Sequence, residues 1–373
     1  MNLLLVTYQG DIAGSTNSII YLAYGLADRG HYVYLGCRKE SLLYKILQNT
    51  KIHLVPMTFR SKFDLTNMKQ IRDAVVKYNI HVINAQSSKD RYTSILARWI
   101  FRLPVWIVHT RRQVSQSVGG LQSWLYRKGT DKIVAVSQGV KDSLVKKGIP
   151  ARHIEVIYNG TPCEKYGYID GSVTDDLRKK FNITKNDFVI GCVSRIKNQV
   201  QLLRALKYLD FKVKVIFVGI GRLPGHDDIV SQYPIDHEIY YEGMVPGDYI
   251  LSYYSLFNVK ILPSTMEGLS QSLLEAMYLK VPVLATKAAG NVDLIRHAYN
   301  GLLFEHNNPL CLKDKIEAIY YDKVDKEDMV NHAFQTASVD FSINKTVRTY
   351  ELFFQNLMNN KLITTQIRPA FSD

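Results

Sequence analysis

The sequence predicts an α/β protein with two domains, each built around a largely parallel sheet. Along most of the 373 residues, short apolar segments typical of buried strands alternate with segments of helical periodicity. The alternation stops at Asn159-Gly160-Thr161-Pro162, gives way to a polar stretch, and begins again at residue 189. A chain of this length can bury two cores. We therefore expect two Rossmann-like domains with a cleft between them.

The first domain opens with a strand, a glycine-containing turn at residues 9–15 and a helix, which is a Rossmann-like beginning. Strand and helix then keep alternating up to residue 158, so the sheet should be parallel and covered on both faces. The expected strands are 3–7, 31–37, 52–56, 82–86, 105–110, 132–137 and 154–158, and the expected helices are 17–27, 65–78, 92–101, 121–128 and 138–147.

The second domain repeats this order after the polar stretch 164–187. We place the domains at residues 1–165 and 166–342, with the boundary in the break. The strand at 259–262 is followed by a polar turn and a helix, so this part forms a βαβ unit. The expected strands are 189–193, 214–218, 239–242, 259–262 and 281–285, and the expected helices are 199–206, 273–279, 310–321 and 343–362.

The net charge of +13 comes entirely from the first half of the chain. Residues 1–160 contain 23 Lys and Arg against 9 Asp and Glu, whereas residues 161–373 contain 24 against 25. Such asymmetry indicates an anionic partner for the first half. The basic stretch Lys89–Lys132 also contains all three tryptophans, a combination that suits an anionic membrane surface. Trp106 is interpreted as a core residue, and Trp124 as the better candidate for contact with a membrane. Nucleic acid would also explain the charge, but no nucleic-acid motif accompanies it, so none is expected.

The composition otherwise indicates a cytoplasmic protein. The four cysteines, Cys37, Cys163, Cys192 and Cys311, are far apart, so reduced thiols without structural zinc are expected. No apolar run approaches the ~20 residues that span a bilayer. Residues 1–8 (MNLLLVTY) are too short for a signal peptide and are interpreted as the first strand.

Two carboxylates, Glu267 and Glu275, lie in the βαβ unit that follows residue 259. Glu267 is in the loop beyond the carboxyl end of a strand, where open α/β sheets bind ligands. The amides of Gly268, Leu269 and Ser270 lead into a helix N-terminus, which suits phosphate. A ligand with phosphates and hydroxyls would fit both groups. Each carboxylate could instead simply complement the helix dipole.

Two other segments are candidates at strand ends. Ser194-Arg195-Ile196-Lys197 directly follows a strand, so its two cations could clamp a diphosphate, or form a solvated basic turn. His109 ends a first-domain strand and could face the cleft or be a satisfied structural histidine. Gly10 and Gly14 could face a ligand or only shape their turn. The G-x-G-x-x-G, GxSxG, HExxH and P-loop motifs are absent, and no acidic cluster indicates a metal.

Together these residues resemble the family 4 glycosyltransferases of the GT-B fold over nearly the whole chain. The most specific part is the signature from Pro263-Ser264 through Glu267-Gly268 to Leu274-Glu275-Ala276-Met277. The supporting matches are Arg195 and Lys197, Gly219-Ile220-Gly221, Ala289-Gly290-Asn291-Val292, His109 and Asn159-Gly160. The resemblance implies two Rossmann-like β/α/β domains that face each other across a cleft, with the last helix, about 343–373, crossing back to the N-terminal domain.

The resemblance also implies a retaining sugar transferase that uses a UDP- or GDP-type sugar and needs no metal or other cofactor. Glu275 would hold the ribose, and Glu267 with the amides of residues 268–270 would hold the donor sugar. Arg195 and Lys197 would neutralise the leaving diphosphate. His109 would contact the donor sugar from the opposite domain. Further donor contacts would come from Gly221, Gly243 and Leu274, and Gly10 and Gly14 would form the acceptor-side glycine loop.

The sequence departs from the family pattern at several positions. Ser194 replaces the glycine before Arg195, and the segment between Arg195 and Lys197 is short. The remaining departures are Ala289 and Val292 in the glycine turn near the last strand, Asn258 where an Asp often begins the strand, and Ala13 in the first glycine turn.

The expected function is sugar transfer to a glycan or lipid-linked acceptor in bacterial surface polysaccharide or lipopolysaccharide synthesis. The enzyme would be cytoplasmic and would bind peripherally to the inner face of the membrane through its basic N-terminal domain. Two alternatives remain open: a nucleotide-sugar epimerase of the same fold, and a non-catalytic protein that binds membranes or polyanions.

Overall fold

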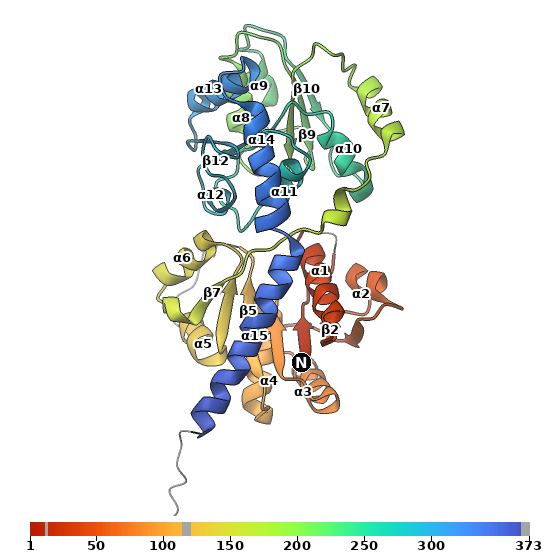
Figure 1. Cartoon of the computed structure of the whole chain (residues 1–373), viewed down its shortest axis with the longest axis vertical. Helices are drawn as coiled ribbons and strands as arrows, with labels where there is room; N and C mark the ends of the chain where they lie inside the picture. Colours follow the sequence, from red (N-terminus) through yellow and green to blue (C-terminus); the bar gives the residue numbers. More distant parts are fainter. Residues whose placement is uncertain (12–13, 114–120, 367–373) are drawn as a thin grey trace, which may run out of the picture. The chain divides into compact units, whose positions relative to one another are not determined.

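The computed structural model describes residues 1–11, 14–113 and 121–366, with side chains left undescribed at 121–122 and 360–366. The chain forms two compact units, one of residues 1–160 together with the helix that begins at Ile343, the other of residues 161–342 (Figure 1). We call them the N-terminal and C-terminal units. The division falls after Gly160, whereas the sequence analysis placed it after residue 165.

The N-terminal unit is a seven-stranded sheet in the order β3-β2-β1-β4-β5-β6-β7, and every pairing is parallel. Seven segments were predicted as strands, and each overlaps one of these strands. The strands are β1 (Asn2–Val6), β2 (Tyr32–Cys37), β3 (His53–Pro56), β4 (Val82–Ala85), β5 (Trp106–Arg111), β6 (Lys132–Ala135) and β7 (Ile154–Val156).

Helices cover both faces of this sheet. Leucines and valines of alternate strand positions pack against α1 and α15 on one face and against α3 and α4 on the other. α1 and α15 lie side by side (Figure 1). The helices are α1 (Gly14–Asp28), α2 (Leu42–Leu47), α3 (Leu65–Tyr78), α4 (Ser88–Phe101), α5 (Leu121–Gly129), α6 (Gln138–Lys146) and α15 (Ile343–Gln366), with a short 3₁₀ turn η1 (Ala151–His153).

The C-terminal unit is a six-stranded parallel sheet in the order β10-β9-β8-β11-β12-β13. Five of its strands overlap predicted segments. The sixth, at residues 302–304, was not predicted because three residues carry too little periodicity. The strands are β8 (Val189–Val193), β9 (Lys214–Val218), β10 (Glu238–Tyr241), β11 (Val259–Leu262), β12 (Val283–Thr286) and β13 (Leu302–Phe304).

The polar stretch 164–187, which the sequence analysis placed between the domains, contains a helix of the C-terminal unit. Asp170 caps this helix by accepting hydrogen bonds from the amides of Ser172 and Val173. This helix was not predicted, because Leu177 is its only buried residue and the sequence therefore shows no apolar helical periodicity. The helices here are α7 (Gly171–Lys180), α8 (Val200–Leu206), α9 (His226–Val230), α10 (Ile250–Tyr254), α11 (Gln271–Tyr278), α12 (Asn291–Leu294), α13 (Pro309–Tyr320) and α14 (Lys326–Gln335), with short turns η2 (Cys163–Tyr166), η3 (Gly247–Tyr249) and η4 (Thr336–Asp340).

Candidate active site

The carboxyl edge of the C-terminal sheet brings most of the predicted donor residues together. β8 and β11 are neighbours, yet the chain leaves β8 toward β9 and β10 on one side and leaves β11 toward β12 and β13 on the other. This reversal of strand order is the place where open α/β sheets bind ligands. The turn after β8 carries Arg195 and Lys197, and the loop after β11 carries Glu267. The topology therefore explains why residues from distant parts of the sequence meet.

Lys197 and Glu267 form an ion pair across this edge, with 3.1 Å between Nζ and Oε1. Both side chains are partly buried, so water screens the pair less than an exposed one. The buried side chain of Gln199 fixes the Lys197 turn. Its amide nitrogen donates to Ser194 Oγ (2.9 Å) and to the Arg195 carbonyl (2.8 Å), and its oxygen accepts from the Lys197 amide (2.7 Å). Gln199 was not predicted as a site residue.

Arg195 is exposed, and its guanidinium forms no ion pair with any Asp or Glu in the described ranges. Lys197 lies two residues away and points its ammonium toward Glu267. A cation that lacks a protein carboxylate is available to a phosphate, and a guanidinium can bind it with two parallel hydrogen bonds. The turn thus offers one free cation and one that is already paired.

The loop after β11 is pressed against the loop after β12. The Glu267 amide donates to the Ala289 carbonyl (3.1 Å), and a side chain at Gly290 would come within 2.6 Å of the Gly268 carbonyl. Gly290 also has φ +81°, which favours glycine. Ala289 replaces the first glycine of the family's pair, but Gly290, the glycine that the geometry requires, is retained. The replacement of the family Pro by Val292 places a half-exposed valine in α12.

The amides of Gly268, Leu269 and Ser270 donate no hydrogen bond to the part of the chain that the structure describes. They precede α11, whose N-cap is Ser270, with its hydroxyl accepting from the Leu273 amide at 3.3 Å. Unbonded amides ahead of a helix N-terminus suit anionic oxygen atoms. Leu274 lies deeper, because its side chain is fully buried in the α11 packing and its amide donates to the Ser270 carbonyl.

Glu275 on α11 is held from two sides. Its Oε1 pairs with Nζ of Lys165 in η2, and its Oε2 accepts a hydrogen bond of 2.9 Å from the Tyr254 hydroxyl in α10. Tyr254 is fully buried, and burial is the main reason why its pKa lies well above the usual value. A carboxylate has about four acceptor positions, so two remain for the hydroxyls of a ligand. Lys165 and Tyr254 were not predicted.

A third cation, Lys260, lies fully buried within β11. Its Nζ donates to Ser272 Oγ at 3.0 Å, and Ser272 Oγ lies 3.2 Å from Ser270 Oγ. Burial lowers the pKa of Lys260 to about 8, while Cys192, Glu267 and Glu275 act in the opposite direction. The sequence analysis interpreted residues 259–262 as an apolar strand. A lysine inside such a strand was the signal that could have identified it.

The remaining predicted donor residues lie along the same edge. Gly219 directly follows β9 and has φ +96°, and its amide donates to the Gly243 carbonyl after β10 (2.6 Å). A side chain at Gly219 would come within 2.8 Å of the Ser194 carbonyl, which explains this glycine by close packing. Gly221 and Gly243 follow in these loops, and a Cβ added at either would meet nothing within 4 Å. Asn258, the departure from Asp, binds the Val189 amide through Oδ1 (2.7 Å) and so joins β11 to β8.

The predicted residues of the N-terminal unit lie at the carboxyl ends of its strands. His109 is buried in β5, 5.4 Å from the Tyr126 ring between centroids, and its Nδ1 has no hydrogen-bond partner among the described residues. Burial, together with Arg91 and Arg111, lowers the pKa of His109 well below its usual value, so the ring is neutral at neutral pH. A side chain at Gly10 would come within 2.5 Å of Ser41 Cβ, so packing requires this glycine. Gly14 begins α1, and Ala13 lies outside the described residues.

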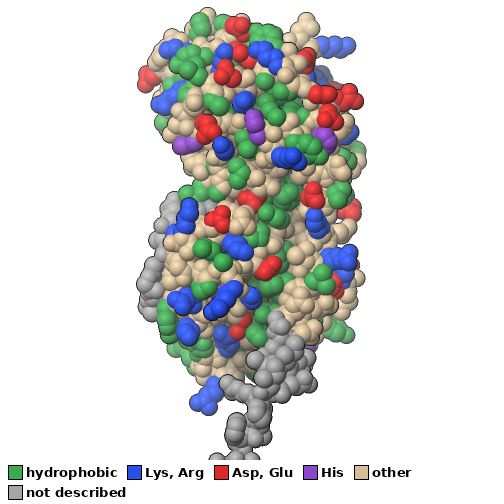
Figure 2. All heavy atoms as spheres, turned by 60° about the vertical axis from the view of Figure 1, so that its left-hand side comes forward, with side chains coloured by type: hydrophobic (Ala, Val, Ile, Leu, Met, Phe, Trp, Pro, Cys, Tyr) green, Lys and Arg blue, Asp and Glu red, His purple; other side chains and the backbone are tan. Residues whose placement is uncertain are grey.

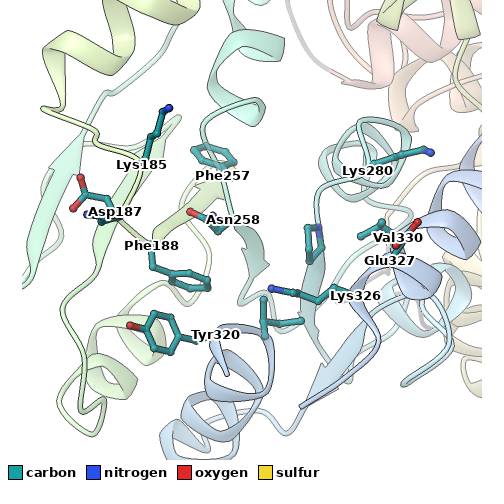
Figure 3. A pocket seen from close by; sticks show the side chains of 13 residues that line it. Lys185, Asp187, Phe188, Phe257, Asn258, Lys280, Tyr320, Lys326, Glu327 and Val330 are labelled. Atoms are coloured by element: carbon teal, nitrogen blue, oxygen red, sulfur yellow. The ribbon is translucent and has the colours of Figure 1, made fainter. Parts of the chain in front are cut away.

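A hollow of about 510 Å³ lies at the other edge of the C-terminal sheet (Figure 3). Phe188, Asn258 and Pro282 line it, and each precedes the amino end of a strand. None of the predicted donor residues lines this hollow. It is therefore separate from the candidate active site.

Two family models match the chain, and together they span most of it. The model described as Glycosyltransferase Family 4 matches residues 12–165, and the model described as Glycosyl transferases group 1 matches residues 173–336. The chain belongs to the family 4 glycosyltransferases. Its two parallel-sheet units are those of the GT-B fold, as the sequence analysis expected.

Individual relatives of this glycosyltransferase are distant. An uncharacterised glycosyltransferase of Methanocaldococcus jannaschii is 25% identical over 59% of this chain. The match spans 60% of that relative's own length. The UDP-Gal:alpha-D-GlcNAc-diphosphoundecaprenol alpha-1,3-galactosyltransferase of Escherichia coli is 25% identical over 78% of this chain and 81% of its own length. Anabaena HepE, solved with UDP-glucose, has 21% identity and a TM-score of 0.79 over 95% of this chain and 100% of that one. At this identity the structural likeness shows the fold alone.

Proposed function

We propose that this glycosyltransferase transfers a sugar, with retention of anomeric configuration, from a UDP- or GDP-sugar to a glycan or lipid-linked acceptor. The observation that carries the proposal is the meeting of the Lys197–Glu267 pair with the unbonded amides of residues 268–270. A nucleotide-sugar presents phosphates and hydroxyls side by side, and this edge presents cations, amides and carboxylates in the same way. The UDP-glucose in the Anabaena structure agrees with such a donor.

The donor would be held by groups with separate tasks. Glu275 has two free acceptor positions for the ribose hydroxyls, while Lys165 and Tyr254 keep its carboxylate in place. Arg195 and Lys197 would bind the diphosphate, whose negative charge increases as the bond to the sugar breaks. Glu267 and the loop amides would contact the sugar hydroxyls. We propose that these cations neutralise the leaving group without a metal.

Retention would follow from attack on the face that the leaving group occupies. The acceptor hydroxyl forms the new bond to the anomeric carbon, the bond from that carbon to the phosphate oxygen breaks, and the hydroxyl proton passes to the released phosphate. No protein nucleophile is needed in this sequence. Glu267, which is paired with Lys197, is therefore proposed as a sugar contact. Glycosidases act through two carboxylates at a set separation, but the distance from Glu267 to a second carboxylate has no such role in this mechanism.

We further propose that the acceptor is attached to a membrane lipid in bacterial surface polysaccharide or lipopolysaccharide synthesis. The E. coli relative is named for a diphosphoundecaprenol acceptor. Within the described residues, no helix is long and apolar enough to cross a bilayer. We propose that the enzyme reaches such a lipid-linked substrate by binding peripherally to the cytoplasmic face of the membrane.

The surface proposed to bind the membrane is formed by α4 and α5. Trp99 and Trp124 are 39% and 51% exposed, and their rings meet edge to face with centroids 5.9 Å apart. An ion pair between Arg98 and Asp131 fixes the end of α4. Basic side chains lie over the face that carries α5 and α6 (Figure 2), and exposed Arg127 and Lys128 follow Trp124. Exposed tryptophans beside basic residues suit an anionic bilayer surface.

The proposed function is tested by incubating the enzyme with UDP- and GDP-sugars, with and without membrane extract as acceptor source. We expect release of nucleotide diphosphate that increases when acceptor is present, and a sugar that moves into the lipid fraction. Conversion of the donor sugar into an epimer without acceptor would instead identify an epimerase. An unchanged donor in every mixture, together with salt-sensitive binding to polyanions, would identify a binding protein.

A further inference from the structure

Several buried hydrogen-bond donors that have no partner among the described residues gather where β4 and β5 end. Among the described residues, no acceptor is found for Asn84 Nδ2, Gln86 Nε2, or Nε and Nη1 of Arg112. Asn84 and Gln86 are only 1% and 5% exposed, and Arg112 is half-buried. Leaving a buried donor without a partner is unfavourable, because the group loses its hydrogen bonds to water and gains none in return. Such a set indicates a ligand that supplies the acceptors.

A hydrogen-bond network fixes the orientation of the two amides. Asn84 Oδ1 accepts from the Thr110 hydroxyl at 2.9 Å, and that hydroxyl lies 3.2 Å from the Tyr350 hydroxyl on α15. Gln86 Oε1 accepts from Arg112 Nη2 at 2.7 Å. Because both amide oxygens are engaged, both amide nitrogens remain as donors. The groups of this network that lack a partner among the described residues are therefore donors.

The charge of this set is positive and uncompensated. Arg112 forms no ion pair with a carboxylate in the described ranges. The nearby Asp90 accepts from the amides of Gln86 (2.8 Å) and Ser87 (2.7 Å), so it serves the turn after β4. Burial lowers the pKa of Arg112, and Tyr350 acts against this shift. A guanidinium remains protonated at neutral pH even after a moderate shift.

The position of the set agrees with a ligand site. Gln86 and Arg112 lie just beyond the ends of β4 and β5. The strand order of the sheet reverses between β1 and β4, which are neighbours. Parallel α/β sheets bind ligands at this edge. The equivalent edge of the C-terminal unit carries the donor site proposed above. The N-terminal set is thus a second polar site on a separate unit.

We propose that Asn84, Gln86 and Arg112 form an oxyanion site that recognises a phosphate or carboxylate group of the acceptor. The proposal rests on the proposed function, since it concerns the second substrate of the same transfer. A planar guanidinium hydrogen-bonded to the Gln86 side-chain amide, with Asn84 of β4 two residues before Gln86, offers several donors to the oxygens of such an anion. A neutral hydroxyl would use one donor and leave the others unbonded.

The test measures binding of three matched probes, glycerol 3-phosphate, glycerate and glycerol, by calorimetry. Saturating UDP or GDP occupies the cations of the donor site beforehand. We expect at least one anionic probe to bind ten-fold or more tightly than glycerol, and Arg112→Gln to remove this difference. A preference for glycerol 3-phosphate assigns a phosphorylated acceptor, and a preference for glycerate assigns an acidic sugar.

Arg152→Gln is the matched control, because Arg152 is an exposed arginine of the same unit. It should change anion affinity less than two-fold. If Arg112→Gln does not fold, Gln86→Leu provides the same test, since it removes a donor and the acceptor that orients Arg112. Equal binding of all three probes by the wild type would overturn the proposal, as would equal losses in Arg112→Gln and Arg152→Gln. Nucleotide binding is read separately, so failure of the donor site is distinguishable.

Discussion

Lys197 Nζ lies 3.1 Å from Glu267 Oε1, although the two residues follow different strands of the C-terminal sheet. The pair exists because β8 and β11 are neighbours whose chains then run to opposite sides. Gln199 holds one partner, and contact with Ala289 holds the other. The finding links a cation to a carboxylate at the point where a diphosphate and a sugar would meet.

Lys197→Gln should lower the turnover number for sugar transfer by about 10²-fold, because a positioned cation that stabilises a leaving group contributes on this scale. Initial rates at saturating donor would measure it. Lys185→Gln is the control, since Lys185 is an exposed lysine that lines the hollow at the other edge of the sheet. Equal turnover in both variants would mean that Lys197 does not act on the leaving group.

Glu275→Ala should weaken nucleotide binding by about ten-fold or more, since hydrogen bonds to a charged group contribute about 1.5–3 kcal/mol. The loss should appear as slow transfer at low donor concentration. Lys165→Met keeps the carboxylate and removes its partner, so it should weaken binding less. Full transfer by Glu275→Ala at low donor concentration would refute the assignment of the ribose to Glu275.

Gly290→Ala should destabilise the C-terminal unit by at least about 1–2 kcal/mol, because alanine at φ +81° is strained and its Cβ would collide with the Gly268 carbonyl. The unfolding midpoint and donor affinity should decrease together, since the collision displaces the loop that carries Glu267. Gly171→Ala, where a Cβ would meet nothing within 4 Å, provides the comparison. A midpoint unchanged in Gly290→Ala would show that the loop can move freely.

Lys260 gives a pH dependence of stability. Its pKa is about 8 in the folded protein, against 10.5 for an ordinary lysine, so the unfolded chain binds more protons between these pH values. Stability attributable to Lys260 should therefore increase with pH, by about 2 kcal/mol from pH 8 to pH 10. Denaturant titrations would give the free energies of unfolding of the wild type and of Lys260→Met, and the difference between them should change with pH. A difference that is constant with pH would mean that Lys260 titrates normally.

The double variant Trp99→Ser/Trp124→Ser should reduce flotation with vesicles that contain anionic lipid, because it removes the exposed aromatic pair. Wild-type binding should decrease with added salt, since Arg127 and Lys128 contribute through charge. A variant of Tyr168, which is exposed in the C-terminal unit, serves as control. Absence of wild-type protein from both anionic and neutral vesicle fractions would refute membrane binding.

The strands were predictable because apolar segments alternate with helices, and this alternation also indicates which loops share the carboxyl edge. Glu267 and Glu275 were identified by their place in one βαβ unit. The boundary predicted after residue 165 placed Lys165 in the N-terminal domain. Its contact with Glu275, which is 110 positions away in the sequence, is seen only in the structure. Tyr254 lay in no predicted element, and Lys260 was placed only within the predicted strand 259–262. Only the packed structure shows which polar groups their side chains reach.

The most direct test of the account is the anomeric configuration of the transferred sugar, measured by NMR on the product from an α-linked UDP- or GDP-sugar. We expect release of nucleotide diphosphate and an α-linked product, and we expect both to be lost in a variant lacking Arg195 and Lys197. A β-linked product would contradict retention. No nucleotide release with any donor would contradict the donor site itself.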